Sequence, residues 1–392
     1  MKPKAAESNA GPFAYVNWKG MEEGRSSDGA AEFPLYTDAH ITGNISQGYG
    51  PYQFLNTGSY SPDTRLKPAI MLRVEDHMPD SQPLSPDMKT DTKRYHGGDI
   101  KDEIAALISL CLGIRLESGG CTRIFESKPI KAKPDWDVRG RPTTREGSDA
   151  PVMPPMRDSP VLPYALGHHS LQDTALLSMM MHLTPRQAIA LVGAARLYQN
   201  AMWIGESQPE LSWLMFVSAV EVAAGQWRQG EYTPLERMQA SRPELIALLT
   251  PFGDDLVQQV AKQIAPFMGA SLGFRSFLLT FLPAPPTSRP NAHDQHPWDN
   301  TTFEKSFKLI YTYRSDALHG GIPFPYPMCR PPRYDITEVC PEKPAGLNSR
   351  TKGAVWSAKD TPMLLHLFEY IVRKLLLAWW QEMVDEPVAS NG

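Results

Sequence analysis

Cysteine is scarce in this chain of 392 residues. The four cysteines, Cys111, Cys121, Cys329 and Cys340, form no CxxC pair. A chain of this length can bury a core without disulfide staples, and so few thiols do not indicate a disulfide framework. Free thiols are typical of reducing compartments. We therefore expect a cytoplasmic protein.

Long apolar runs are also missing. The first residues, MKPKAAESNAGPFAYV, lack the apolar core of a secretory signal. The most apolar segment, 363–380, is interrupted by four ionisable side chains, whereas a membrane span needs about 20 predominantly apolar residues. We expect a soluble protein with no membrane partner, and we interpret 362–384 as a helix that is buried or forms an interface.

The chain has no excess of positive charge. Its net charge is −4 and its pI is near 6.2, so binding to nucleic acid would depend on a local basic patch. The common signatures GxGxxG, GxxxxGK[ST], HExxH and GxSxG are absent. The pairs His168–His169 and His293–His296 lack the further ligands that zinc requires. We expect no cofactor and no metal.

Proline, by contrast, is abundant, with 37 residues in clusters. The cluster at 129–165 predicts an extended connector between an N-terminal region, 1–128, and a helical region, 166–392. The N-terminal region reads as loops, one strand at 68–76 and one amphipathic helix at 99–117. The expected fold is mainly α, with a helical bundle after a less regular α+β region. The helices predicted in the bundle start at Thr184-Pro185 or cover 210–227, 233–249, 254–282, 301–318 and 362–384.

Two of these helices carry a charge on an apolar stripe. Arg314 shares the stripe of Phe303, Phe307 and Ile310 in the helix 301–318. Glu221 interrupts the stripe of the helix 210–227 at the same phase. Burying either charge alone is costly, so we expect the two side chains to pair on facing helices. The pair has two interpretations: a structural ion pair that fixes register, or part of a functional site.

His319 favours the functional interpretation. It follows Arg314 by five residues, about 140° around and about 7.5 Å along an ideal helix, so both side chains could contact one phosphate at the helix end. An imidazole can donate and accept protons near neutral pH, and a helix C-terminus favours its cationic form. Simple capping of the helix end is the alternative.

The segment 309–320, LIYTYRSDALHG, resembles the Arg-x4-6-His motif of HEPN domains, in the form Y-x-x-R-S-x-x-x-H-G of ApeA-like HEPN proteins. The segment 213–225, WLMFVSAVEVAAG, resembles the helix that carries the family's A-L-E-A-L pattern. The resemblance covers roughly 170–384. The position after the arginine is often Asn, Asp or His in active members; here it is Ser315, which ApeA-like members commonly have, followed by Asp316.

The resemblance implies a four- to six-helix bundle that forms a homodimer, with two Arg–His motifs facing each other. Many members are metal-independent endoribonucleases of toxin–antitoxin or anti-phage systems, which implies RNA as substrate and an antitoxin or phage-derived trigger as partner. Arg314 would then hold the scissile phosphate and His319 would transfer protons, leaving 2′,3′-cyclic phosphate ends. Ser315, Asp316, Glu221 and Tyr311 would support them.

A second hypothesis is a non-catalytic HEPN scaffold or a module that binds RNA or nucleotides. The proline-rich loop after His319 is mildly basic, and Arg330, Arg333 and Tyr334 are its candidate RNA contacts. A solvated surface loop is the alternative interpretation. Residues 1–165 match no family pattern, and we expect them to sense a trigger, bind a partner or cover the site.

Overall fold

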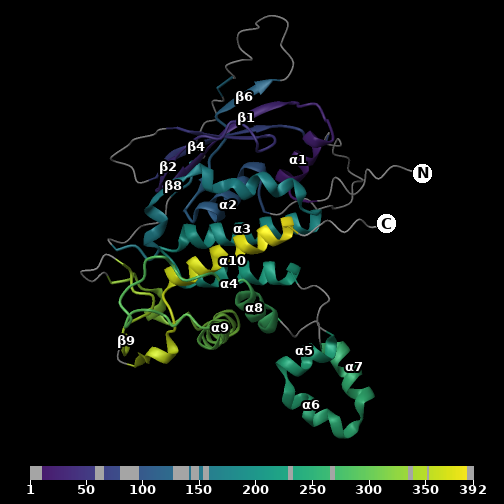
Figure 1. Ribbon diagram of the computed structural model, residues 1–392, viewed down its shortest axis with the longest axis vertical. Helices are drawn as coiled ribbons and strands as arrows, with labels where there is room; N and C mark the ends of the chain where they lie inside the picture. The colour runs from purple at the N-terminus through teal and green to yellow at the C-terminus, as the bar shows by residue number, and fades with distance from the viewer. Residues whose placement is uncertain are drawn as a thin grey trace, which may run out of the picture. The chain divides into compact units, whose positions relative to one another are not determined.

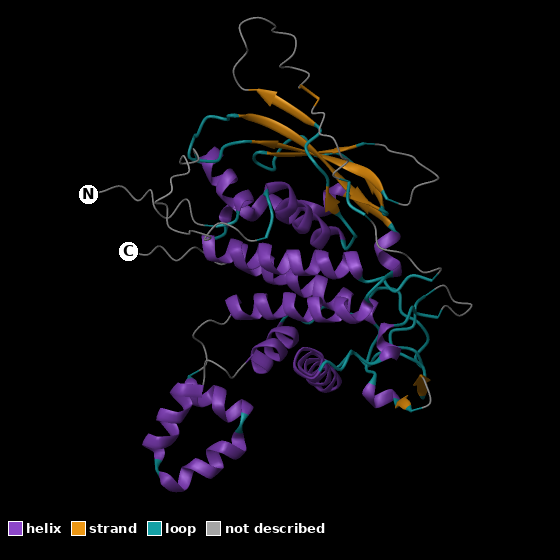
Figure 2. Ribbon diagram, turned by 180° about the vertical axis from the view of Figure 1, so that it is seen from behind, coloured by secondary structure: helices purple, strands orange, loops and turns teal. Residues whose placement is uncertain are grey.

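A computed structural model of the chain describes residues 11–57, 66–79, 97–126, 141–142, 150–152, 159–227, 233–264, 270–333, 339–350 and 353–385. Helices predominate in it, and one antiparallel sheet lies in the N-terminal part (Figures 1 and 2). The contacts divide the chain into two compact units. Unit 1 comprises 1–155, 163–203 and 380–392, and unit 2 comprises 156–162 and 204–379.

The sheet of unit 1 has the strand order β3-β4-β1-β6-β7, with β5 also beside β1. Its strands are β1 (Gly29–Thr37), β3 (Tyr52–Asn56), β4 (Lys67–Glu75), β5 (Glu117–Ser118), β6 (Arg123–Glu126) and β7 (Arg141–Pro142). The antiparallel register places Glu32 opposite both Arg73 and Arg123, and its carboxylate lies 2.6 Å from the Arg73 guanidinium. The other face carries buried apolar side chains such as Leu72 and Val74. This alternation gives the sheet one polar face and one face that packs on helices.

Helices α1 (Phe13–Glu22) and α2 (Ile100–Leu112) lie on that apolar face (Figure 2). Glu103 of α2 is fully buried and accepts hydrogen bonds from the backbone N–H groups of Phe13 and Ala14, at 3.2 and 2.7 Å. Burial raises the pKa of this carboxyl to about 8. A side chain 90 residues away therefore supplies the N-terminal hydrogen bonds that α1 lacks locally.

The prediction for residues 1–128 was wrong in assigning them one strand and one helix. The predicted strand is β4 and the predicted helix is α2, but α1, β1, β3 and β6 are also present. The sequence of β1, GAAEFPLYT, contains two alanines, a glycine and a proline, which have low strand propensity. It becomes a strand because β4 and β6 pair with its two edges.

Unit 1 also contains segments from the region that the sequence assigned to the helical domain. These are η1 (Pro163–Leu166), β8 (His168–Ser170), η2 (Leu171–His182) and all but the last residue of α3 (Pro185–Ile204). The reason is pairing and packing: β8 pairs with β2 (His40–Thr42), η2 contacts α1 and α2, and Gln199 of α3 donates to the Leu116 carbonyl at 2.6 Å. The division by contacts thus differs from the boundary predicted at 129–165, most of which lies outside the described residues.

Unit 2 is built on α4 (Pro209–Trp227), α8 (Ala270–Thr280), α9 (Asn300–Ser315) and most of α10 (Leu365–Asp385). Trp213 of α4 is fully buried and stacks on Phe368 of α10 and on Phe324, at centroid distances of 4.6 and 5.3 Å. These contacts pack α4, α10 and the loop after α9 around one aromatic core. The remaining short elements are η5 (Asp316–Gly320), η6 (Tyr326–Cys329), β9 (Asn348–Arg350), β10 (Ala354–Trp356) and η7 (Ala358–Asp360).

Two predicted helices of unit 2 are divided. The helix predicted at 233–249 consists of α5 (Pro234–Ser241) and α6 (Pro243–Leu249), because Pro243 cannot continue the hydrogen bonding of α5. The helix predicted at 254–282 consists of α7 (Asp254–Ile264) and α8. Helices α5, α6 and α7, with the turn η3 (Thr250–Phe252), enclose a small apolar cluster around Met238, Val257 and Ala261.

Helix α10 confirms one of the two interpretations of 362–384. Its apolar side chains Leu375, Leu376, Trp379 and Trp380 are all fully buried within the chain. The chain's own core therefore covers these four side chains, whereas Leu377 of the same stretch is half-buried. Within the described residues, no helix combines the length and apolar character that crossing a bilayer requires.

Candidate active site at the end of helix α9

An N-terminal cap and a buried apolar stripe determine the position of helix α9 and of its C-terminal end. The Asp299 carboxylate accepts a hydrogen bond from the backbone N–H of Thr302 at 2.9 Å, which starts the helix. Phe303, Phe307 and Ile310 are fully buried against the rest of unit 2. The stripe therefore fixes the rotation of α9 and directs the next position on it, Arg314, toward α4.

The ion pair expected between the two charged stripe positions is present. Nη2 of Arg314 on α9 donates to Oε2 of Glu221 on α4 at 2.7 Å. The side chains are 21% and 19% exposed, so the pair lies at the border of the core rather than inside it.

Tyr311 joins this pair through its hydroxyl and its ring. Its hydroxyl donates to Oε1 of Glu221 at 3.2 Å, and its ring lies 5.7 Å from the Arg314 guanidinium carbon. Burial, and then the negative charge of Glu221, raise the pKa of Tyr311 to about 12. Tyr311 is thus a hydrogen-bond donor and not a base at neutral pH, and both oxygens of Glu221 are occupied.

Arg314 keeps donors that its carboxylate partner does not use. A guanidinium carries five N–H groups, and the contact with Glu221 engages Nη2 alone. The Nε atom of Arg314 is buried and has no hydrogen-bond partner among the described residues. A buried donor without a partner costs free energy, and the remaining N–H groups on Nη1 and Nη2 are the ones left for an anion at this partly exposed border.

The helix does not end as the α-helix predicted to residue 318. A π turn, η5, spans Asp316–Gly320, and Gly321 follows in the left-handed region with φ of 66°. Its N–H donates back to the carbonyl of Asp316. Because a π turn holds more residues than the 3.6 of an α turn, residues five apart come closer to the same face. The turn therefore brings His319 nearer to the side of Arg314 than α geometry would, and His319 is exposed to solvent.

Ser315 and Asp316, the other two residues expected to support the site, make fewer contacts than Tyr311 and Glu221. Ser315 is half-buried and Asp316 is exposed, and neither side chain forms a hydrogen bond or ion pair with a described residue. Asp316 acts at longer range: burial, then Asp360 and then Asp316 raise the pKa of Tyr313 to about 12.

Tyr313 and Phe324 also position this helix end, although the sequence analysis did not select them. The Tyr313 hydroxyl donates to the Asp360 carbonyl at 2.7 Å, and its ring packs on Phe324 at 6.0 Å. Phe324 in turn stacks on Trp213. The alternation of proline with aromatic residues in the segment 323–327, PFPYP, was the available signal.

The basic loop after His319 brings two of its three candidate RNA contacts together. Arg330 and Arg333 line a pocket of about 160 Å³, and Lys343 and Asp294 also line it. The Arg330 guanidinium also lies 5.6 Å from the ring of Tyr326. Tyr334 lies outside the described residues.

No group of three or more His, Cys, Asp or Glu side chains suited to a metal ion occurs in the described part of the chain. His296, one of the histidines considered as a ligand, is buried, and its Nε2 lies 3.0 Å from the Ser306 hydroxyl. The four cysteines are free thiols.

Comparison of the chain with protein-family models, with curated proteins and with solved structures found no match.

Proposed function

We propose that the chain is a metal-independent endoribonuclease of the HEPN type, with Arg314 and His319 as its catalytic residues. The observation that carries the proposal is the helix end itself. Glu221 and Tyr311 hold a guanidinium that retains free donors, and a π turn presents an exposed imidazole five residues later. A cation and a proton-transfer group at one solvent-accessible point suit the cleavage of a phosphodiester.

In this reaction the ribose 2′-oxygen attacks the adjacent phosphorus. The new bond between O2′ and phosphorus forms as the bond from phosphorus to O5′ breaks, which leaves a 2′,3′-cyclic phosphate and a free 5′-hydroxyl. The base takes the proton of the 2′-hydroxyl, and an acid delivers a proton to O5′. His319 performs one of these transfers, while Arg314 stabilises the extra negative charge on the phosphoryl oxygens.

The second transfer requires a second group, which a homodimer would supply as another copy of His319. The surface next to His319 favours such an assembly. Leu318 and Ile322 flank His319 in the sequence and are 51% and 61% exposed, so two large apolar side chains lie uncovered next to this polar site. Covering them with the same surface of a second copy would bring two Arg314–His319 sites together.

The HEPN resemblance further suggests an effector of a toxin–antitoxin or anti-phage system. In that setting an antitoxin would restrain the activity or a phage-derived trigger would release it. Growth arrest on induced expression of the wild type, and none with His319→Ala, is the outcome expected for such an effector.

The alternative function is a non-catalytic HEPN scaffold or a module that binds RNA or a nucleotide. The pocket formed by Arg330, Arg333 and Lys343 favours this reading, because three cations around a small cavity suit phosphate groups without any cleavage. Under the ribonuclease proposal the same residues would hold RNA near the site.

An assay of end-labelled RNA cleavage in the presence of EDTA distinguishes the ribonuclease from the non-catalytic binding module. The wild type should cut, and the product ends should be cyclic phosphates. His319→Ala and Arg314→Ala should not cut. The matched controls are His293→Ala, an exposed histidine of the same unit, and Arg275→Ala, a partly buried arginine paired with Glu304 at 3.7 Å. Loss of cleavage with EDTA, or equal cleavage by His319→Ala, would leave the binding module as the better account.

A further inference from the structure

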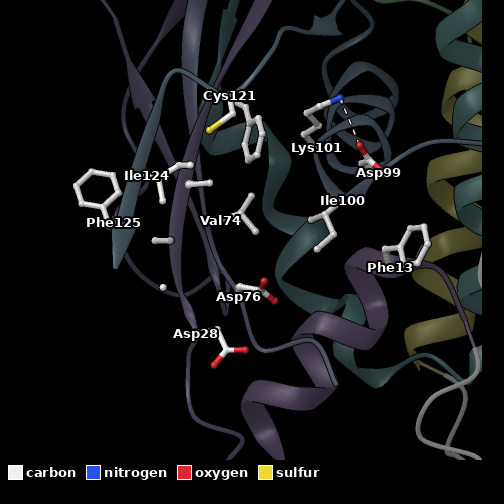
Figure 3. A pocket seen from close by; sticks show the side chains of 14 residues that line it. Phe13, Asp28, Val74, Asp76, Asp99, Ile100, Lys101, Cys121, Ile124 and Phe125 are labelled. Atoms are coloured by element: carbon white, nitrogen blue, oxygen red, sulfur yellow. Dashed lines mark ion pairs between the residues drawn. The ribbon is translucent and has the colours of Figure 1, made fainter. Parts of the chain in front are cut away.

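The apolar face of the sheet in unit 1 is not fully covered by its helices. A pocket of about 450 Å³ remains between the start of α1, the start of α2 and the strands β1, β4 and β6 (Figure 3). This volume falls within the roughly 300–1,000 Å³ of sites that bind small molecules. All of the residues that line it belong to unit 1.

The walls of the pocket are mostly apolar. Ala31, Val74 and Ile124 are partners across three antiparallel strands, so their side chains lie on the same face of the sheet. Phe13 of α1 and Ile100 of α2 face them from the helical side (Figure 3). Ile124 is 44% exposed, although it lies on the face that is otherwise buried. The fold thus leaves apolar surface uncovered at this one end of the sheet.

Negative charge predominates among the polar side chains of the pocket. Lys101 lies 3.0 Å from Asp102 and 4.0 Å from Asp99, so its positive charge is already neutralised by neighbouring carboxylates. Asp28 and Asp76 lie on the other side of the pocket, at the ends of adjacent strands (Figure 3). Neither forms an ion pair with a cation in the described part of the chain, and both are exposed.

We infer that this pocket binds a small organic cation, with an apolar body between Ile100, Val74 and Ile124 and an ammonium group beside Asp28 and Asp76. The uncovered apolar wall supplies the burial energy, and the unpaired carboxylates supply the charge preference. The pocket lies in a different unit from Arg314 and His319, and the inference does not depend on the ribonuclease proposal.

Three probes with the same phenylbutyl body test the charge preference: 4-phenylbutylamine, 4-phenylbutanol and 5-phenylpentanoate. Titration calorimetry with the full chain should rank them amine, alcohol, acid. Each exposed carboxylate should contribute about 2–5-fold in affinity, so the amine should exceed the alcohol by roughly tenfold at low salt and the acid by more. The difference should shrink as salt rises, because exposed charges are screened.

Variants locate the binding. Asp28→Asn with Asp76→Asn should bring the amine down to the affinity of the alcohol, whereas Asp173→Asn, an exposed carboxylate elsewhere in unit 1, should leave the ranking unchanged. Ala31→Trp should fill the cavity and abolish binding of all three probes. Ile124→Arg, at a position already 44% exposed, should abolish binding of the amine by placing a competing cation beside the two aspartates, even if Ala31→Trp fails to fold.

Equal affinity of the amine and the acid would overturn the inference. So would the absence of binding by any probe, or undiminished binding to a folded Ala31→Trp or Ile124→Arg variant.

Discussion

Among the arginine–glutamate pairs of unit 2, those of Arg289 and Arg314 differ in how completely the arginine is used. Nε and Nη2 of Arg289 donate to the two oxygens of Glu342 at 2.7 and 2.6 Å, and Nη2 also donates to the His296 carbonyl. Glu342 is only 3% exposed and accepts a further bond from the His296 backbone. Arg314 donates to Glu221 through Nη2 alone, at a border that is about one-fifth exposed.

The difference indicates what each pair does. The Glu342 carboxylate takes the planar fork of Arg289 in a bidentate pair and joins two proline-rich loops, which is a structural task. Glu221 fixes Arg314 by one contact and leaves other donors for a ligand at the end of α9. We therefore expect substitutions at the first pair to change stability, and substitutions at the second to change chemistry.

The largest change in stability should come from Glu342→Ala. It leaves the Arg289 charge and the His296 backbone N–H without their acceptor in a buried site, which typically costs about 3–5 kcal/mol. Chemical denaturation measures this loss of unfolding free energy. RNA cleavage per folded molecule should stay at the wild-type value. A loss of cleavage in the folded fraction would show that the comparison is wrong.

Low pH should also destabilise the proline-rich loops around Arg289 and Glu342, because two buried histidines contact them. Burial lowers the pKa of His296 and of His366 from 6.5 to about 4. In the folded chain both histidines stay neutral down to about pH 4. Above about pH 6.5 they are neutral in the unfolded chain as well, so the free energy of unfolding has its full value there. As the pH falls toward 4, the unfolded chain binds protons first, and each histidine should lower the unfolding free energy by about 2–3 kcal/mol.

Denaturation curves between pH 7 and pH 4 check this. His366→Gln should flatten the pH dependence, and exposed His293→Gln should not change it. An identical pH dependence in the wild type and in His366→Gln would contradict the assignment, because that comparison cancels other titrating groups such as Glu103.

Glu221→Ala should have a smaller effect on stability, of about 1–2 kcal/mol, because Arg314 and Tyr311 lose their partner at a site that water partly reaches. Thermal unfolding would measure it against Glu304→Gln, whose side chain is 59% exposed and should change little. Glu221→Ala should also reduce cleavage by releasing Arg314 from its position. Unchanged cleavage would exclude a positioning role for Glu221.

The smallest effect on folding should come from the exposed apolar residues beside His319. Leu318→Asp with Ile322→Asp should alter unfolding by less than about 0.5 kcal/mol, because both side chains are mostly exposed. Light scattering should nevertheless report a monomer where the wild type is a dimer. A wild type that is monomeric at micromolar concentrations would refute the composite site.

Local signals made much of unit 2 predictable. The spacing of Phe303, Phe307 and Ile310 predicted α9, and two charges on apolar stripes predicted the contact between Arg314 and Glu221. Here the sequence pattern is sufficient, because each helix carries its own amphipathic period.

Other features depend on partners far away in the chain. Strand β1 forms through pairing with β4 and β6, and α1 starts on a carboxylate that Glu103 brings from α2. The bidentate pair of Arg289 joins residues 53 positions apart in irregular loops, where no periodicity exists. The π turn after Arg314 requires the backbone of Gly321 in a left-handed conformation, which a pattern of apolar residues does not encode.

The central claim is that Arg314 and His319 act as one catalytic unit. Single-turnover cleavage of labelled RNA with EDTA, by the wild type, Arg314→Ala, His319→Ala and the double variant, tests it most directly. Each single substitution should lower the rate by about 10²–10⁴-fold, and the double variant should be little slower than either single one. Arg314→Lys should not restore the rate, since lysine lacks the planar fork. If the rate of His319→Ala equals that of the wild type, or if the two single effects multiply in the double variant, the claim is contradicted.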